Sequence, residues 1–268
     1  MDFDTRVYSL EPTPADWEEQ VKKQHEENRT RTIEELKYQF GEWAAEAKIR
    51  NFADLDIKPF SILAYHNKFL EQIRNSFVIG SYYPALTGAC ALGERILNHL
   101  VITLREYHKH TPEYKSVYRQ SSFDNWPLVI STLEAWEILL PVVSENFRKL
   151  NEKRNKAIHF DLQTERDDRE IALQVIKILQ EIIANQFPSL GTQPWFFWVP
   201  GECYIKKEWE EKPFVKVLYL PNCGYVGYKH KVESISPKWV INDQFEYEEV
   251  SLTDEEYAER RKRTQKAS

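Results

Sequence analysis

Three residues, Arg154, Asn155 and His159, combine residue types and a spacing that suit phosphoryl chemistry. At about 100° per residue, Asn155 and His159 are one helical turn apart and share a face of the helix expected here, whereas Arg154 is turned by about 100° from Asn155. A guanidinium offers a planar fork of donors that matches a phosphate, and an imidazole exchanges protons near neutral pH. The three side chains therefore predict metal-free phosphoryl chemistry on RNA.

The bare Arg-x4-His spacing is a weak signal, because Arg105 and His110 repeat it. Context separates the two copies. Arg154 is followed by a polar amide and lies between two strongly periodic helices, whereas Arg105 lies where a helix is expected to fray into the polar residues 109–112. We therefore place the predicted chemistry at Arg154.

Each charged residue of this motif also has a structural interpretation. Arg154 could form an ordinary ion pair, which contributes only about 0–1 kcal/mol when exposed. His159 could bond a backbone carbonyl at a helix end and take no part in catalysis. The acidic residues that could pair with the arginine are Glu94, Glu152 and Asp161.

The composition is that of a soluble globular protein with a substantial core: 268 residues, 42% hydrophobic and 29% charged. The net charge of −6 argues against a non-specific nucleic-acid coat, although a local basic patch could still attract phosphate. No apolar run reaches the roughly 18–20 residues that span a bilayer, and the acidic residues at the N-terminus are unlike a signal peptide. We therefore expect a cytoplasmic protein with no membrane partner.

The cysteines, Cys90, Cys203 and Cys223, are scattered and odd in number, which disfavours a disulfide framework. Cys203, Cys223 and His230 could converge on zinc, but they lack the paired Cys or His spacing of zinc sites. With eight glycines and no glycine-rich phosphate loop, the sequence does not indicate a dinucleotide fold. We expect neither a metal nor a cofactor.

The sequence divides into three expected parts. Residues 1–57 contain N-terminal charged helices, 58–188 a helical bundle, and 189–268 an aromatic β-rich module with a C-terminal helix. Within the first part, residues 1–13 are expected to be an irregular lead. A helix start is expected near residue 14 and a break near Asn28.

The bundle is predicted by apolar residues at three- and four-residue spacing. Small residues between Ala85 and Gly93 permit close approach of helices, and a polar loop is expected over 109–127. The expected helices cover 59–77, 82–104, 128–140, the segment from Pro141 through the Arg154 motif, and 168–187.

Beyond residue 191 the pattern favours strands. The β-branched and aromatic runs at 195–199, 214–220 and 225–228 are separated by turn signals and predict a small antiparallel sheet. A charged helix over 253–266, capped by Thr253, closes the chain.

The aromatic residues of this module could stack RNA bases beside lysines. Strand alternation places half of the rings in the core, so we favour plain packing or a partner-docking surface. These residues are Trp195, Trp198, Tyr204, Tyr219, Tyr225, Tyr228 and Trp239.

Three blocks of the sequence resemble the HEPN superfamily: SYYPAL at 81–86, LGERIL at 92–97, and KRNKAIH at 153–159, followed by a final helix. The resemblance covers roughly residues 58–187. HEPN proteins are helical bundles with an arginine, a polar residue and then a histidine, and many are metal-independent endoribonucleases of toxin, anti-phage and CRISPR systems. The fold class implied is mainly α: a HEPN-like helical bundle with N-terminal helices and a small C-terminal antiparallel β-rich module.

The resemblance implies a role for each residue of the motif. Arg154 would bind the scissile phosphate and stabilise its transition-state charge, and Asn155 would orient the histidine or donate to the phosphate. His159 would act as general base on the ribose 2′-hydroxyl or as general acid on the leaving oxygen. Cleavage would leave a 2′,3′-cyclic phosphate, and a homodimer would bring two motifs into one cleft.

The function implied is a metal-independent endoribonuclease of toxin or anti-phage defence type. Its partners would be the RNA substrate, a second copy of the chain, and an antitoxin or defence-complex protein at the C-terminal module. The alternative is a catalytically silent HEPN-like subunit that binds a nucleotide or assembles a defence complex. A third interpretation is an interaction protein whose aromatic module docks a partner chain.

Overall fold

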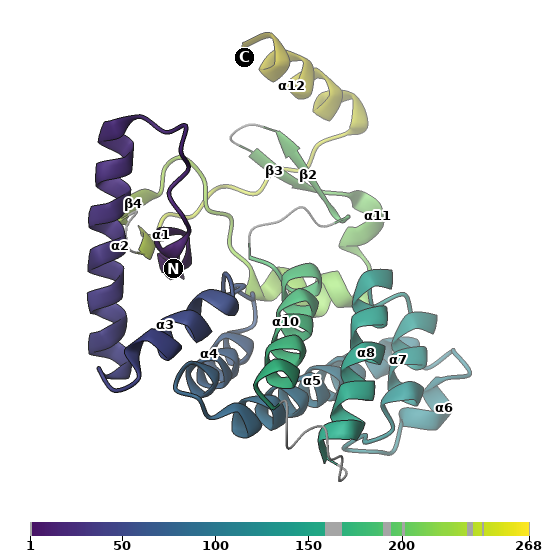
Figure 1. Ribbon diagram of the computed structural model, residues 1–268. Helices are drawn as coiled ribbons and strands as arrows, with labels where there is room; N and C mark the ends of the chain where they lie inside the picture. Colours follow the sequence, from purple (N-terminus) through teal and green to yellow (C-terminus); the bar gives the residue numbers. More distant parts are fainter. Residues whose placement is uncertain are drawn as a thin grey trace.

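The computed structural model describes residues 2–158, 168–189, 194–199, 202–234, 238–242 and 244–267. Most of these residues are helical, and the strands are short and antiparallel (Figure 1). The mainly α fold class is confirmed in this coarse form. The domain boundaries expected from the sequence stay a prediction.

The N-terminal residues are more regular than the sequence predicts. Asp2–Asp4 form strand β1 and Arg6–Leu10 form helix α1, so the expectation of an irregular lead was wrong. Strand β1 pairs antiparallel with β5 (Lys238–Asn242), from the other end of the sequence. A partner so distant along the chain leaves no local pattern by which to recognise the strand.

Helix α2 (Glu19–Phe40) runs without the break expected near Asn28. Asn28 is an interior residue of this helix, and its Oδ1 accepts a hydrogen bond from Arg31 Nη2, one turn further on, at 2.8 Å. The chain turns instead at Gly41, whose φ of 82° is open to glycine, and α3 (Ala45–Asp54) follows.

The longer helices of the bundle agree with the expected ones. Pro141 is the first residue of its helix, and Asn125 caps another by accepting a hydrogen bond from the Leu128 N–H at 3.1 Å. The helices are α4 (Ala64–Val78), α5 (Tyr82–Leu104), α7 (Trp126–Ala135), α8 (Pro141–Ile158) and α10 (Asp168–Gln186), with the short η1 (Arg105–His108) and α6 (Tyr114–Val117) between α5 and α7.

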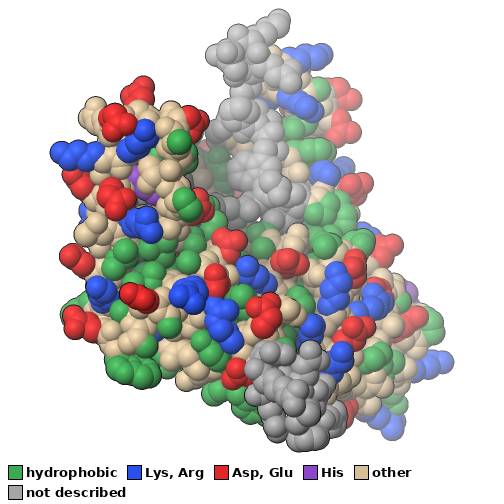
Figure 2. Space-filling model, in the orientation of Figure 1, with side chains coloured by type: hydrophobic (Ala, Val, Ile, Leu, Met, Phe, Trp, Pro, Cys, Tyr) green, Lys and Arg blue, Asp and Glu red, His purple; other side chains and the backbone are tan. Residues whose placement is uncertain are grey.

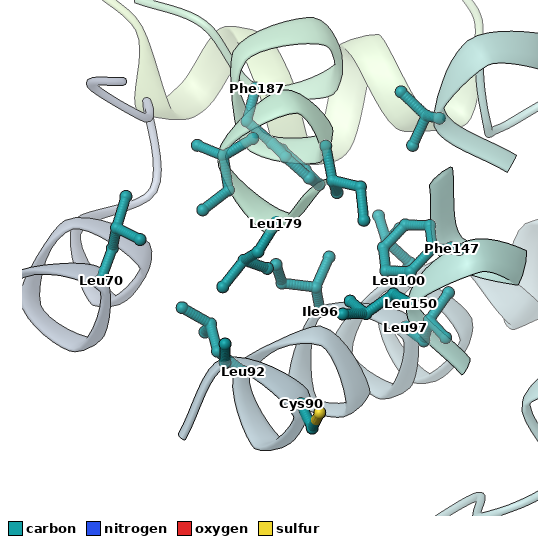
Figure 3. Close-up of a cluster of buried hydrophobic side chains, with 14 of the residues drawn as sticks. Leu70, Cys90, Leu92, Ile96, Leu97, Leu100, Phe147, Leu150, Leu179 and Phe187 are labelled. Carbon is teal, nitrogen blue, oxygen red and sulfur yellow. The ribbon is translucent and has the colours of Figure 1, made fainter. Parts of the chain in front are cut away.

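Helix α5 is the centre of the bundle, packed against α4, α7, α8 and α10. Figure 3 shows Leu92 and Ile96 of α5 beside Leu179 of α10 and Leu150 of α8. Each of these side chains is at most 2% exposed. Burial of apolar surface stabilises the fold by roughly 25 cal/mol per Å², so α5 must keep its apolar face against these neighbours. Once that face is buried, the directions of the other α5 side chains are determined.

Gly93 permits the close approach of α5 to α7 and α8. A Cβ at this position would lie 2.6 Å from Leu150 Cδ2 and 3.0 Å from Trp126 Cη2. Both neighbours are buried, at 0% and 1% exposure, and have little room to move. The next residue, Glu94, is thereby held beside α7 and α8.

The C-terminal residues contain two small sheets. Strand β2 (Phe196–Val199) pairs antiparallel with β3 (Glu202–Ile205), and β4 (Lys231–Ser234) pairs with β5. Helix α12 (Asp254–Ala267) follows, and Thr253 caps it as predicted, with Thr253 Oγ1 accepting from the Glu256 N–H at 3.3 Å. In Figure 1 the β2–β3 hairpin and α12 lie at the top of the view, beyond the short α11 (Lys207–Glu210).

The predicted strand over 214–220 was wrong. Phe214–Tyr219 form the π-helical segment η2, followed by η3 (Leu220–Asn222), and residues 225–228 belong to no regular element. In η2 the Phe214 ring packs 5.9 Å from the Phe187 ring at the end of α10. Tertiary packing against the bundle therefore overrides the β-propensity of this run.

The surface carries charges of both signs. Figure 2 shows Lys and Arg side chains next to Asp and Glu over the bundle, without a broad basic field on this face. This mixture agrees with the net charge of −6. Among the helices that the structure describes, none has an apolar stretch long enough to cross a bilayer.

His66 is a fully buried polar residue of α4. Its Nδ1 lies 2.8 Å from Ser61 Oγ, and its ring packs edge-on to Phe187 with 4.6 Å between centroids. Burial, followed by the charge of His99, lowers the pKa of His66 to about 3. The imidazole is therefore neutral in the folded protein near neutral pH.

Gly93→Ala is expected to lower the free energy of unfolding by about 1–3 kcal/mol, because the added methyl group overpacks the contact with Leu150 and Trp126. The higher helix propensity of alanine opposes this by about 1 kcal/mol, so the net loss lies toward the lower end. Urea denaturation measures the change. Gly224→Ala is the control, because a Cβ there meets nothing within 4 Å. A Gly93→Ala protein as stable as wild type would contradict the close packing.

The second prediction concerns acid stability. The folded-state pKa of His66 is about 3, below the unfolded value, so on acidification the unfolded chain takes up the proton first. The stability contributed by His66 is complete above about pH 6.5 and is lost at about 1.4 kcal/mol per pH unit as the pH falls.

Urea denaturation at pH 7 and pH 5 should therefore show a loss about 2 kcal/mol larger in wild type than in His66→Asn. The exposed His110 gives the control, since His110→Asn should keep the wild-type slope. Identical pH dependence in wild type and His66→Asn would show that His66 is not the buried neutral group described.

Candidate active site

Arg154 lies near the end of α8, and its side chain reaches across to α5. Its Nη2 donates to Oε2 of Glu94 at 2.9 Å, which makes an ion pair between the two helices. The Arg154 and Glu94 side chains are 21% and 32% exposed. The pair thus lies at the edge of the bundle, sheltered from bulk water but accessible from one side.

Trp126, at the start of α7, completes this arrangement. Its indole Nε1 donates to the same Glu94 Oε2 at 3.3 Å, and the guanidinium carbon of Arg154 lies 5.5 Å from its ring centroid. A cation over an aromatic face is attracted by the ring quadrupole. One carboxylate and one indole, from two different helices, therefore hold the guanidinium in place.

Cys90 lies one helical turn before Glu94 on α5. Burial raises the pKa of its thiol to about 12, although the positive charge of Arg154 acts in the opposite direction. The thiol therefore stays protonated at neutral pH and is not a nucleophile.

Asn155 is exposed, one residue beyond the half-buried Arg154. This agrees with the offset of about 100° between successive helical residues. Arg154 faces α5 and α7 while Asn155 faces solvent at the same end of α8. His159 lies outside the described residues, so its relation to Asn155 stays a prediction.

The second Arg-x4-His copy has a structural role. Arg105 Nη1 donates to the backbone oxygens of Val117 and Gln120, at 2.9 and 2.6 Å, and so fastens the segment that follows η1 to the end of α5. His110 is exposed. Helix α5 ends at Leu104, directly before Arg105, where the sequence predicted that the helix would fray.

Two further groups of suggestive residues do not form open sites. Ser61 and His66 are in hydrogen-bond contact, but they are 1% and 0% exposed, so a substrate cannot reach them. His230 uses both ring nitrogens: Nδ1 accepts from the Gly227 N–H at 3.0 Å, and Nε2 lies 2.7 Å from the Phe245 oxygen. Neither nitrogen is left to join a cysteine in holding zinc.

The arrangement around Arg154 is suited to binding an oxyanion. The ion pair with Glu94 engages Nη2, and no other residue that the structure describes accepts a hydrogen bond from this guanidinium. The remaining N–H donors and the exposed amide of Asn155 can bind phosphate oxygens. Glu94 lowers the net charge of the site, so binding relies on directed hydrogen bonds more than on bulk attraction.

Comparison of the chain with protein-family models, with curated proteins and with solved structures finds no match. The HEPN resemblance therefore stays a prediction from the three sequence blocks. The chemistry of the site follows from its own geometry.

Sequence reasoning selected Arg154 and offered Glu94 as one of three acids that could pair with it; the structure selects Glu94. It missed Trp126, which was assigned to a loop end. The signal was present in Asn125-Trp126-Pro127, because an Asn cap followed by Pro in the first turn places the tryptophan inside a helix.

Substitutions at Glu94 should separate its two bonds. Glu94→Gln keeps an acceptor for the Trp126 indole but loses the charge, and is expected to cost roughly 1 kcal/mol of unfolding free energy. Glu94→Ala is expected to cost about 1–3 kcal/mol, because it also leaves a buried N–H without an acceptor. Urea denaturation compares the two. Glu145→Gln is the control: it removes the charge of the exposed partner of Lys149, and the free energy of unfolding should stay at the wild-type value. Equal losses for Gln and Ala would refute the indole bond.

Proposed function

We propose that this protein is a metal-independent endoribonuclease of HEPN type that acts in the cytoplasm as a toxin or defence effector. Arg154, Asn155 and His159 form its active site. The observation that carries the proposal is the guanidinium of Arg154, fixed by Glu94 and Trp126 yet partly exposed beside Asn155. In the reaction the ribose 2′-oxygen attacks the adjacent phosphorus, the 5′-oxygen leaves with a proton, and a 2′,3′-cyclic phosphate forms.

The role of Arg154 is to bind the phosphate oxygens and stabilise the charge that gathers on them. Donors that are already held in place stabilise a transition state without a reorganisation cost. The Glu94 carboxylate and the Trp126 ring supply this restraint. Asn155, exposed and adjacent, donates its amide to the phosphate or orients His159.

The reaction needs a base for the 2′-hydroxyl and an acid for the leaving 5′-oxygen. A single His159 cannot hold both protonation states at once. In a homodimer with two-fold symmetry the two copies of His159 share one cleft, one neutral and one protonated. The homodimer is therefore part of the proposed mechanism.

Purified protein is expected to cleave RNA in the presence of EDTA. His159→Ala should reduce the rate by about 10²–10⁴-fold, because the general acid and base are lost. Arg154→Ala should reduce it by about 10²–10³-fold, the usual effect of removing one donor to the transition state. Gel analysis of a labelled RNA measures cleavage, and phosphatase resistance of the new 3′ end identifies the cyclic phosphate.

The second Arg-x4-His copy supplies a matched control. His110→Ala changes an exposed histidine at the same spacing and should cleave at the wild-type rate. Circular dichroism establishes that each variant is folded. If wild-type protein leaves RNA intact, or if His159→Ala and His110→Ala cut equally well, the proposed function is wrong.

A catalytically silent subunit that binds a nucleotide or assembles a defence complex is the second candidate. The Glu94–Arg154 ion pair favours this candidate. An arginine already paired with a carboxylate stabilises transition-state charge less well, but it can still donate directed hydrogen bonds to a phosphate. Mass spectrometry of small molecules released from the purified protein separates the candidates. A bound nucleotide without RNA cleavage would favour the silent subunit.

A further inference from the structure

A cluster of aromatic and basic side chains lies where α4 packs against α5. The Tyr65 ring of α4 and the His99 ring of α5 are 4.8 Å apart between centroids and tilted by 33°. The guanidinium carbon of Arg95 lies 5.3 Å from the centroid of Phe69. Arg95 and His99 are one turn apart on α5, so the two pairs lie side by side on one face.

The two permanent positive charges of this cluster, on Arg95 and Lys68, have no acidic partner among the described residues. Both side chains are exposed, and Lys68 lies three residues after Tyr65 on α4, on the same side of that helix. Arg154, by contrast, is paired with Glu94. Unpaired cations that cluster in a chain with 42 acidic and 36 basic residues mark a local attraction for anions.

Tyr65 and Phe69 are partly buried, whereas the His99 ring is exposed. Burial raises the pKa of the Tyr65 phenol, and burial followed by the charge of Arg95 lowers the pKa of His99. Near neutral pH both rings are uncharged. An uncharged, exposed imidazole backed by a tyrosine offers a flat surface on which a base can stack.

The cluster adjoins the candidate active site. Glu94 and Arg95 are consecutive on α5, so the Arg154 pair and the Arg95–His99 cluster are about 100° apart around the helix. The exposed face between them carries the small side chain of Ala91. Because a helix with its side chains is about 10 Å wide, the path between the two groups is short enough for an oligonucleotide to span.

We propose that Tyr65, Lys68, Arg95 and His99 form a binding site for single-stranded RNA, in which the cations contact phosphates and a base stacks on His99. The inference rests on the proposed function for the identity of the ligand, and it assigns the path of the substrate across α5. A single strand fits because its bases are free to stack, whereas a duplex would present only its backbone to the cluster.

The test measures binding without cleavage. A fluorescein-labelled single-stranded RNA with 2′-O-methyl groups lacks the attacking hydroxyl, and fluorescence anisotropy with the full chain gives its affinity. Arg95→Ala and His99→Ala are each expected to weaken binding by roughly 5- to 100-fold. Arg119→Ala is the matched control, because Arg119 is also exposed and lies 4.9 Å from an aromatic ring, that of Tyr118. It should bind as wild type does.

The salt dependence separates the two roles. Each phosphate contact contributes about 0.7 to the slope of log affinity against log salt for a single strand. Arg95→Ala should lower the slope by about that amount, whereas His99→Ala should leave it unchanged because stacking releases no counterions. If Arg95 had only a structural role, Arg95→Ala would not lower the slope of log affinity against log salt by the amount expected for one phosphate contact.

The RNA-binding site would be overturned if the wild-type protein bound no RNA, or if Arg95→Ala and Arg119→Ala bound it equally well. It would also be overturned if Arg95→Ala changed the oligomeric state and not the RNA affinity, because the cluster would then be an interface between copies of the chain. Failure of the proposed function gives a different result. A wild-type chain that binds through Arg95 and His99 but cuts no unmodified RNA would retain the binding site and lose the nuclease.

Discussion

The absence of a side chain at Gly93 determines how closely α5 approaches α7 and α8. A methyl group there would lie within 3.0 Å of both Leu150 and Trp126, two fully buried residues of the core. Because protein interiors are close-packed, helices cannot yield freely at such a contact. The pairing of Glu94 with Arg154 and Trp126 follows from it, since Glu94 is the next residue on α5. The candidate active site is therefore a consequence of helix packing.

The arginines of the bundle differ in what they bond, and this separates structural from functional candidates. Arg74 is buried and donates to the backbone oxygens of Leu55 and Asp56 at 3.1 and 2.7 Å. Arg105 likewise donates to backbone carbonyls. Arg154 bonds one carboxylate among the described residues, and Arg95 lies on an aromatic ring with no acidic partner among them. Arg154 and Arg95 therefore have donors available to a ligand.

The aromatic residues near the C-terminus differ in how far they are exposed. Trp195 and Tyr219 are 1% and 2% exposed, and their rings lie 5.2 Å apart. They cannot stack on a base. Tyr228, at 77% exposure, is the contrasting case. Trp195 packs against Phe214 of η2, and Tyr219, the last residue of η2, donates its hydroxyl to the Pro188 oxygen, so both residues attach the C-terminal residues to the bundle.

Much of the helical architecture follows from the sequence alone. Periodic apolar residues and Thr253 as a cap predicted helices α5, α8, α10 and α12, because helical periodicity and capping are local properties. The motif also predicted that Arg154 and Asn155 face different directions. Long-range packing decided the rest: which acid pairs with Arg154, that Trp126 supports it, that Phe214–Tyr219 are helical, and that β1 pairs with β5. These outcomes depend on residues far apart in the chain, whose proximity is set by the burial of a shared core and not by any neighbouring residue.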